Sequence, residues 1–130
     1  MIKLLAVAII VYVGCCYDFY LVRHGARAPL KEGNSKSTHK VFGVGKEQLT
    51  MPGKSEAYYF GKQLRLIYKS LKNEELMVYS TPFSRTRMTA EYFLKGWSYQ
   101  HPYIPSMKDD IVTFSANPKH VPPIVLSFKP

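Results

Sequence analysis

Two arginines bracket a histidine at the point where an apolar run of the chain ends. Arg23 and His24 directly follow the run Phe19–Val22, and Arg27 comes three residues after the histidine. A guanidinium group offers rigid, permanently charged donors that match phosphate oxygens two at a time. A neutral histidine nitrogen can attack phosphorus, and the covalent intermediate splits one hard displacement into two easier ones. These residue types at this spacing predict an anion site that contains a nucleophile.

The run before this cluster is typical of a strand that is buried on both faces of a parallel sheet. Phe19–Val22 is short, rich in aromatic and β-branched residues, and apolar on both alternating faces. Gly25 and Pro29 interrupt the pattern, so we expect the charged cluster in the loop after the strand. Open α/β sheets bind their ligands at this edge, beyond the carboxyl ends of the strands. Gly25 would also allow the backbone to pass close to a ligand.

A second strand and helix are predicted further along the chain. Leu76–Ser80 is another short apolar run and predicts a second buried strand. Thr81–Pro82 follows as N-cap and first helical residue, and we expect the helix to extend over Phe83–Gly96 with Gly96 as its stop. Arg85 would lie in the first turn, beside free backbone N–H groups and the positive end of the helix dipole. We therefore expect Arg85 to join the anion site; an exposed helix arginine is the alternative.

The residues between the two strands predict a loop and a packed helix. Leu30–Gln48 is polar and long enough to shape substrate access. Thr50 is a natural N-cap, and Pro52 is tolerated in a first helical turn. Over Ala57–Leu71, apolar residues recur every three or four positions and form one stripe. Strand, helix, strand and helix in this order indicate the α/β alternation of a parallel sheet.

Prolines interrupt the chain after Trp97, and this part predicts little regular structure. Val121–Phe128 contains a short apolar run that would suit a strand, but no helix is predicted after it. The acidic pair Asp109–Asp110 is typical of a solvated turn.

Two stretches of the chain resemble the signatures of the histidine acid phosphatases. The segment Arg23–Pro29 matches the whole pattern Arg-His-Gly-x-Arg-x-Pro, and Ser80–Thr86 is similar to Ser-Thr-x-x-x-Arg-Thr. Pro82 stands where the family often has an aspartate. By this resemblance, His24 is the nucleophile of a phosphohistidine mechanism. The resemblance also implies three arginines on the phosphate: Arg23, Arg27 and Arg85.

The same resemblance implies an α/β fold with three αβα layers and a mainly parallel sheet, of which this chain is an incomplete copy. It also implies an acid phosphatase that hydrolyses phosphate monoesters. The family carries its general acid in a His-Asp or His-Ala-Glu motif far into the C-terminal half, and this chain has neither motif. We therefore expect a chain that is truncated before its general acid. A substitute acid at Asp109 or Asp110 is the alternative.

The N-terminus has the pattern of a signal peptide. Lys3 supplies the positive start, Leu4–Val13 is an unbroken apolar run, and Gly14–Cys16 supplies small residues near a plausible cleavage site. The run is too short for a comfortable membrane span, although an uncleaved anchor is the alternative. We expect a signal peptide over 1–16 and the N-terminal part of a histidine acid phosphatase domain over 17–130. The product would enter the secretory pathway and be secreted or lysosomal.

The charge and the few metal-binding residues of the chain restrict its partners. Its 130 residues carry a formal net charge of +9, which favours an anionic partner, but no Lys/Arg-rich run that would indicate nucleic-acid binding. The two cysteines are adjacent, and the four histidines form no pair with metal-ligand spacing. We expect a phosphate monoester substrate and no metal, cofactor or nucleic acid.

Two other functions fit part of the pattern. A non-catalytic remnant that binds phosphate or a polyanion would keep the arginines without the acid. The phosphoglycerate mutase-like branch shares Arg-His-Gly with this chain. The predicted signal peptide and the extension Arg27-x-Pro29 argue against a cytosolic mutase.

Overall fold

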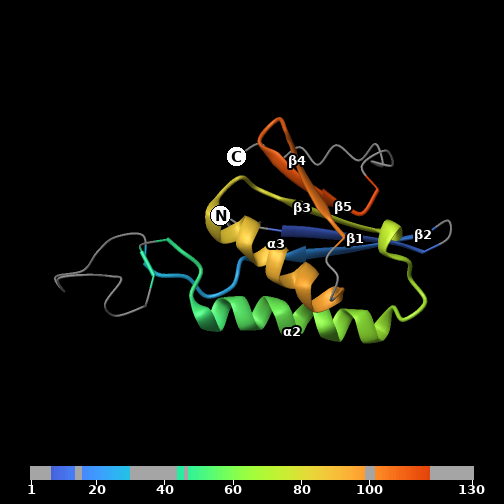
Figure 1. Cartoon of the computed structure of the whole chain (residues 1–130), viewed down its shortest axis with the longest axis horizontal. Coiled ribbons are helices and arrows are strands. Elements are labelled where there is room, and N and C mark those ends of the chain that lie inside the picture. The colour runs from blue at the N-terminus through green and yellow to red at the C-terminus, as the bar shows by residue number, and fades with distance from the viewer. Residues whose placement is uncertain (1–6, 14–15, 30–43, 46, 99–101, 118–130) are drawn as a thin grey trace.

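The computed structural model describes residues 7–13, 16–29, 44–45, 47–98 and 102–117 (Figure 1). Most of the predicted loop Leu30–Gln48 and all of the predicted strand in Val121–Phe128 lie outside these residues. The elements in chain order are β1 (Val7–Val13), β2 (Cys16–Val22), α2 (Met51–Ile67), the 3₁₀ turn η1 (Asn73–Glu75), β3 (Leu76–Ser80), α3 (Ser84–Trp97), β4 (Ile104–Lys108) and β5 (Ile111–Ser115).

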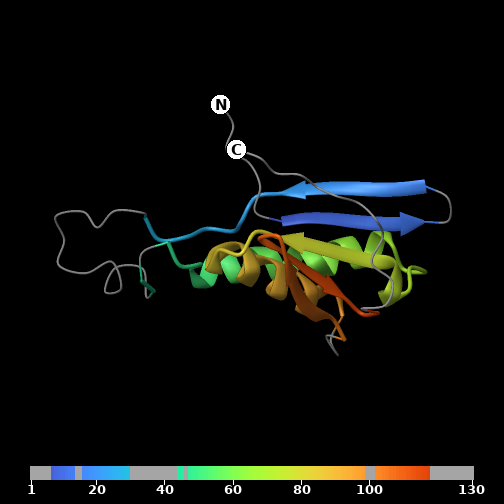
Figure 2. The ribbon, with the colours of Figure 1, turned by 90° about the horizontal axis from the view of Figure 1, so that it is seen from above.

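The five strands form one sheet in the order β2-β1-β3-β5-β4, and every hydrogen-bonded pair is antiparallel. The predicted mainly parallel sheet is therefore wrong. Only two residues separate β1 from β2, and only two separate β4 from β5. Connections of this length join antiparallel neighbours, because a parallel neighbour needs a crossover of a dozen residues or more. Figure 2 shows β1 and β2 side by side at one end of the sheet.

The segment that was expected to be the apolar centre of a signal peptide forms β1. All seven residues of Val7–Val13 pair with β2, and five of them also pair with β3. Since β2 and β3 are both antiparallel to β1, they run parallel to each other with one strand between them. Their carboxyl ends consequently lie at the same edge of the sheet, as the sequence predicted.

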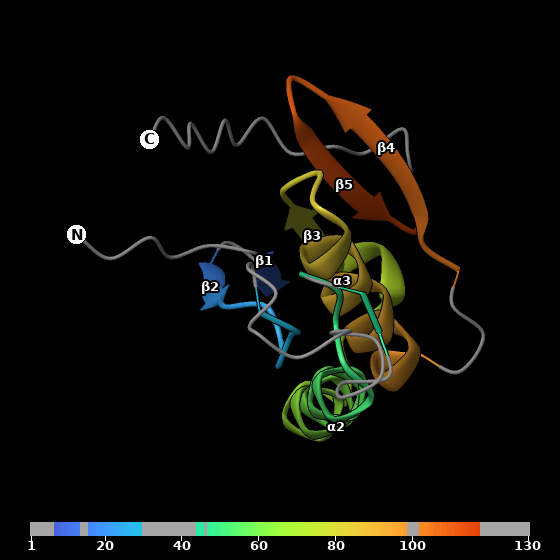
Figure 3. The ribbon, with the colours of Figure 1, turned by 90° about the vertical axis from the view of Figure 1, so that its left-hand side faces the viewer.

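Both helices lie on the same side of the sheet (Figure 3). The described part of the chain thus has two layers, a sheet and a helical layer, instead of the expected three. The prediction of three layers is wrong for these residues, because α3 packs on one face of the sheet and α2 packs on α3 from the same side. Neither helix in the described residues is long and apolar enough to cross a membrane.

Helix α2 begins as its sequence predicts. The Thr50 side chain accepts a hydrogen bond from the Gly53 backbone N–H at 3.3 Å, and Pro52 lies in the first turn. The helix ends at Ile67, so the predicted stripe extends past it: Leu71 is buried but belongs to the turn that follows. Ile67 itself is 71% exposed, which places it off the packed face.

Helix α3 begins two residues later than predicted. Phe83 is its N-cap residue, while the Thr81 hydroxyl instead lies 2.6 Å from the Thr86 hydroxyl. Gly96 does not end the helix, because the helix includes Trp97. A Cβ at Gly96 would collide with the backbone of Tyr58 on α2. The glycine therefore allows the two helices to approach closely.

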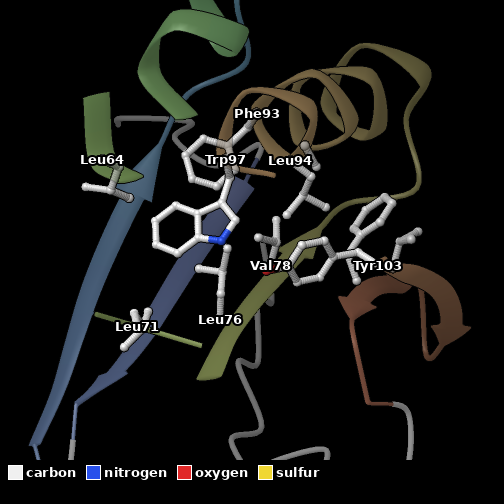
Figure 4. Packing of buried hydrophobic residues seen from close by; sticks show 11 residues of the cluster. Leu64, Leu71, Leu76, Val78, Phe93, Leu94, Trp97 and Tyr103 are labelled. Carbon is white, nitrogen blue, oxygen red and sulfur yellow. The ribbon is translucent and has the colours of Figure 1, made fainter. Parts of the chain in front are cut away.

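The core lies between the helices and the sheet (Figure 4). β3 is buried along its whole length, as predicted, and Val78 packs in one cluster with Phe93 and Trp97 of α3. β2 differs from its prediction because, among the described strands, it lies at the edge of the sheet and pairs only with β1. Leu21 is accordingly 48% exposed, so β2 is not buried on both faces.

The hairpin of β4 and β5 was not predicted from the sequence. Its turn is the pair Asp109–Asp110, with φ values of 51° and 60°. A two-residue hairpin turn with both central residues at positive φ matches the right-handed twist of the strands it joins, and aspartate tolerates this conformation. Both residues are exposed, so the prediction of a solvated turn is confirmed.

Candidate active site

The candidate site forms where β2 ends and α3 begins. Arg23 and His24 follow the last residue of β2, and Arg85 is the second residue of α3. The loop after β2 is held by the segment that leads into α2: Ala28 N–H donates to the Gln48 carbonyl, and Thr50 N–H donates to the Ala26 carbonyl, both at 2.9 Å. The backbone under the site is therefore fixed by hydrogen bonds.

Gly25 lies against the start of α2. A Cβ at this position would be 2.6 Å from the Gly53 carbonyl oxygen, closer than real Cβ contacts come. Gly53 has the same constraint, because a Cβ there would collide with the backbone of Ala26. Gly25 is thus required by the close packing of the loop on α2, a reason that the sequence alone did not supply.

The ring of His24 is oriented by its own neighbour. Nδ1 lies 2.8 Å from the Gly25 carbonyl oxygen, and since a carbonyl can only accept, Nδ1 must donate. In a neutral imidazole the other nitrogen, Nε2, then carries the lone pair. This tautomer offers Nε2 as a nucleophile.

The surroundings of His24 favour its neutral form. Burial is the largest effect and lowers the pKa of the imidazole below its ordinary value. The hydrogen bond to Gly25 raises this pKa, but three positive charges lower it further: Arg27, Arg85 and Arg23. The structure therefore brings all three predicted arginines within electrostatic reach of the predicted nucleophile.

Arg27 and Arg85 each have a buried Nε donor without a hydrogen-bond partner among the described residues. Arg27 Nη1 donates to the Ala28 carbonyl at 3.1 Å, and Arg85 Nη1 lies 3.8 Å from a carboxylate oxygen of Glu47. Buried polar groups are normally paired, so these free donors fit an anionic ligand such as phosphate. Arg23 is exposed at the edge of the site.

Thr89 is a site residue that the sequence did not reveal. Its hydroxyl accepts from Gly25 N–H at 3.2 Å and donates to the Arg85 carbonyl at 2.7 Å. The side chain is 3% exposed and joins the loop that carries His24 to the helix that carries Arg85. The sequence could have indicated this role, because Thr89 lies four residues after Arg85 and therefore on the same face of the predicted helix.

A cavity of about 190 Å³ adjoins the nucleophile. Arg23 and His24 line one part of it, and the rest comes mainly from apolar side chains of α2 and α3, including Phe60 and Phe93. Glu56 of α2 also lines the cavity, and its Oε2 accepts from Ala26 N–H at 3.4 Å. The sequence did not single out Glu56, and Asp109 and Asp110 do not line the cavity.

Comparison with known proteins identifies the class to which this site belongs. The family described as "Histidine phosphatase superfamily (branch 2)" matches residues 19–121, and the chain belongs to this family. The resemblance of the two signatures to the histidine acid phosphatases is thus confirmed at the level of the family.

A similar protein is lysosomal acid phosphatase of Xenopus laevis, which is 35% identical over 108 residues. The match covers 78% of this chain and 24% of that protein, so the chain spans about a quarter of its relative's length. No solved structure matches the chain significantly.

Proposed function

We propose that this chain is the N-terminal part of an acid phosphatase that hydrolyses phosphate monoesters through a phosphohistidine on His24. The observation that carries the proposal is the arrangement of His24 itself. Its Nδ1 is bound to the Gly25 carbonyl, and the charges of Arg23, Arg27 and Arg85 act on its ring. A nucleophilic nitrogen in a cluster of guanidinium groups is what phosphoryl transfer to an enzyme requires.

Each group has a role in the proposed reaction. Nε2 of His24 attacks phosphorus and displaces the alcohol, and water later releases phosphate from the histidine. The three arginines bind the non-bridging oxygens and neutralise the charge that these oxygens carry in the transition state. The unused Nε donors of Arg27 and Arg85 support this role.

Replacement of the nucleophile tests the proposal. We expect His24→Ala to abolish hydrolysis of p-nitrophenyl phosphate and the formation of an acid-labile phosphoprotein in rapid-quench experiments with labelled substrate. Arg87→Gln is a suitable control, since Arg87 is exposed and its charge is not among those that act on His24. Turnover that survives in His24→Ala would refute the nucleophile assignment.

A second candidate function is a phosphate- or polyanion-binding remnant without catalysis. The arginines are present, whereas the family's general-acid motif is absent from the sequence. This function predicts that vanadate binding survives His24→Ala, weakens in Arg27→Gln and Arg85→Gln, and is accompanied by no turnover in the unmodified chain.

We also propose that residues 1–16 act as a signal peptide and that the product enters the secretory pathway. The apolar run after Lys3 supports this, as does the word "lysosomal" in the name of the Xenopus relative. N-terminal sequencing of the protein recovered from expressing cells tests it. A product that begins near Tyr17 is expected, and one that keeps Met1–Cys16 in full would refute it.

A further inference from the structure

Glu47 has an unusual backbone conformation beside the arginines of the site. Its φ angle is 62°, and it is the third residue of a turn that Gln48 N–H closes on the Gly45 carbonyl at 3.2 Å. A positive φ at this position of a turn favours glycine or asparagine. The other described residues that combine a side chain with positive φ are Asp109 and Asp110, and aspartate tolerates that conformation. A glutamate with this backbone conformation therefore needs another explanation.

Hydrogen bonds hold this turn over the site. Glu47 N–H donates to the Pro29 carbonyl at 3.2 Å, and the Gln48 carbonyl accepts from Ala28 N–H at 2.9 Å. The Gln48 side chain accepts from the Ser84 hydroxyl at 2.9 Å. The backbone of Glu47 is consequently attached both to the loop after β2 and to the first turn of α3.

The Glu47 carboxylate faces the guanidinium group of Arg85. Its Oε1 lies 3.8 Å from Arg85 Nη1, a distance at which charges attract without a hydrogen bond. The Phe83 ring covers one face of the guanidinium group, with its centroid 4.6 Å from Cζ, so an anion meets Arg85 along the planar edge. Nε on that edge is buried and has no hydrogen-bond partner among the described residues. Arg85 therefore has one carboxylate nearby and a donor left for a second anion.

We propose that Glu47 sets the affinity of the site for phosphate. Its carboxylate shares Arg85 with the bound phosphate, neutralises part of the attracting charge, and repels the second anion. The affinity for inorganic phosphate is lowered in this way, and the product of the reaction leaves the site more readily. This inference rests on the proposed phosphatase function, because inorganic phosphate is the product of that reaction. Glycine would adopt the backbone conformation without strain but would remove the carboxylate from Arg85.

Calorimetric titration of the 130-residue chain with inorganic phosphate tests this role. We expect Glu47→Gln to lower the Kd for phosphate by about two- to fivefold, the size expected for a partly exposed ion pair. Glu47→Gly should lower the Kd to a similar extent and also raise the midpoint of thermal unfolding, because glycine relieves the positive φ. In the Arg85→Gln background, Glu47→Gln should leave the Kd nearly unchanged, since the shared guanidinium group is gone.

A matched control is Asp109→Gly, which removes one negative charge from another residue with positive φ, in the turn between β4 and β5. The Kd for phosphate should be unaffected by this change. An unchanged Kd in Glu47→Gln, an equal decrease in Asp109→Gly, or the same decrease without Arg85 would each overturn this inference alone. A chain that binds no phosphate, or whose phosphate binding does not weaken in Arg85→Gln, would instead overturn the proposed function, and this inference with it.

Discussion

Two features act on the ring of His24 at the scale of the single residue. The Gly25 carbonyl fixes which nitrogen holds the proton, and burial together with three arginine charges lowers the pKa of the ring. Because a histidine is nucleophilic when neutral, a lower pKa keeps the attacking form populated at more acidic pH. An acid phosphatase works under such conditions, so the electrostatics of the site agree with the proposed chemistry.

The pKa of His24 can be measured directly by NMR titration of its ring protons. We expect the pKa to lie below the ordinary histidine value of 6.5 in the unmodified chain. Arg85→Gln should raise it, since one of the charges that disfavours the imidazolium form is removed. Arg87→Gln is the matched control on the same helix and should leave the titration unchanged. Equal shifts in the two variants would contradict the specific placement of Arg85.

At the scale of elements, the sequence predicted the parts of the chain that local patterns determine. Thr50 caps α2 as expected, β3 is fully buried, and the ends of β2 and β3 bring His24 and Arg85 together. These features depend on capping chemistry, hydrophobic periodicity and two short signatures, all of which can be read within a few residues.

The features that the sequence did not predict depend on contacts between distant segments. Nothing local indicates that Gly96 will face the backbone of Tyr58, or that the Thr89 hydroxyl will meet the backbone of Gly25. The pairing of β1 between β2 and β3 is equally non-local, and an apolar run with a positively charged start fits a signal peptide as well as a strand.

Thr89 provides a test at this scale, because it links two elements of the site. Thr89→Val has nearly the same shape but leaves Gly25 N–H without its acceptor. We expect the free energy of unfolding, measured by urea denaturation, to fall by about 1–3 kcal/mol. Thr89→Ser restores the hydroxyl and should recover most of that loss. A serine variant as unstable as the valine variant would show that packing, and not hydrogen bonding, is the contribution of this side chain.

At the scale of the whole molecule, β1 joins the strand that precedes the nucleophile to the rest of the sheet. β2 pairs with no other strand in the described residues, so its position in the sheet depends on β1. The Tyr68 hydroxyl also ties β2 to the end of α2, because it donates to Asp18 at an exposed site and lies 2.6 Å from the Tyr20 hydroxyl at a part-buried one. The position of β2 in the sheet therefore depends on Val7–Val13, while the hydrogen bonds of Thr89 separately link the loop of His24 to the helix of Arg85.

A proline in β1 tests this dependence. Ile9 pairs with Tyr20 on one side and with Val78 on the other, so Ile9→Pro removes a hydrogen-bond donor from the middle of the sheet. We expect faster amide hydrogen exchange in Phe19–Val22 and a lower unfolding midpoint. Ile9→Val keeps the N–H group and serves as the control. Unchanged exchange in β2 of the proline variant would show that β2 holds its place without β1.

The seven residues of Val7–Val13 form β1 in the fold, whereas the proposed export signal requires the same residues to be accessible and then removed. In a chain that closes its sheet first, these residues are paired in β1 and are not accessible to a targeting factor. In the structure β1 separates β2 from β3 by about 10 Å, and a chain whose leader is removed first lacks this intervening strand. Such a chain loses the strand through which β2 joins the sheet, although the hydrogen bonds of Thr89 still link the loop of His24 to the helix of Arg85. The order of leader removal and sheet closure would then decide whether β2 keeps β1 as its partner in the sheet.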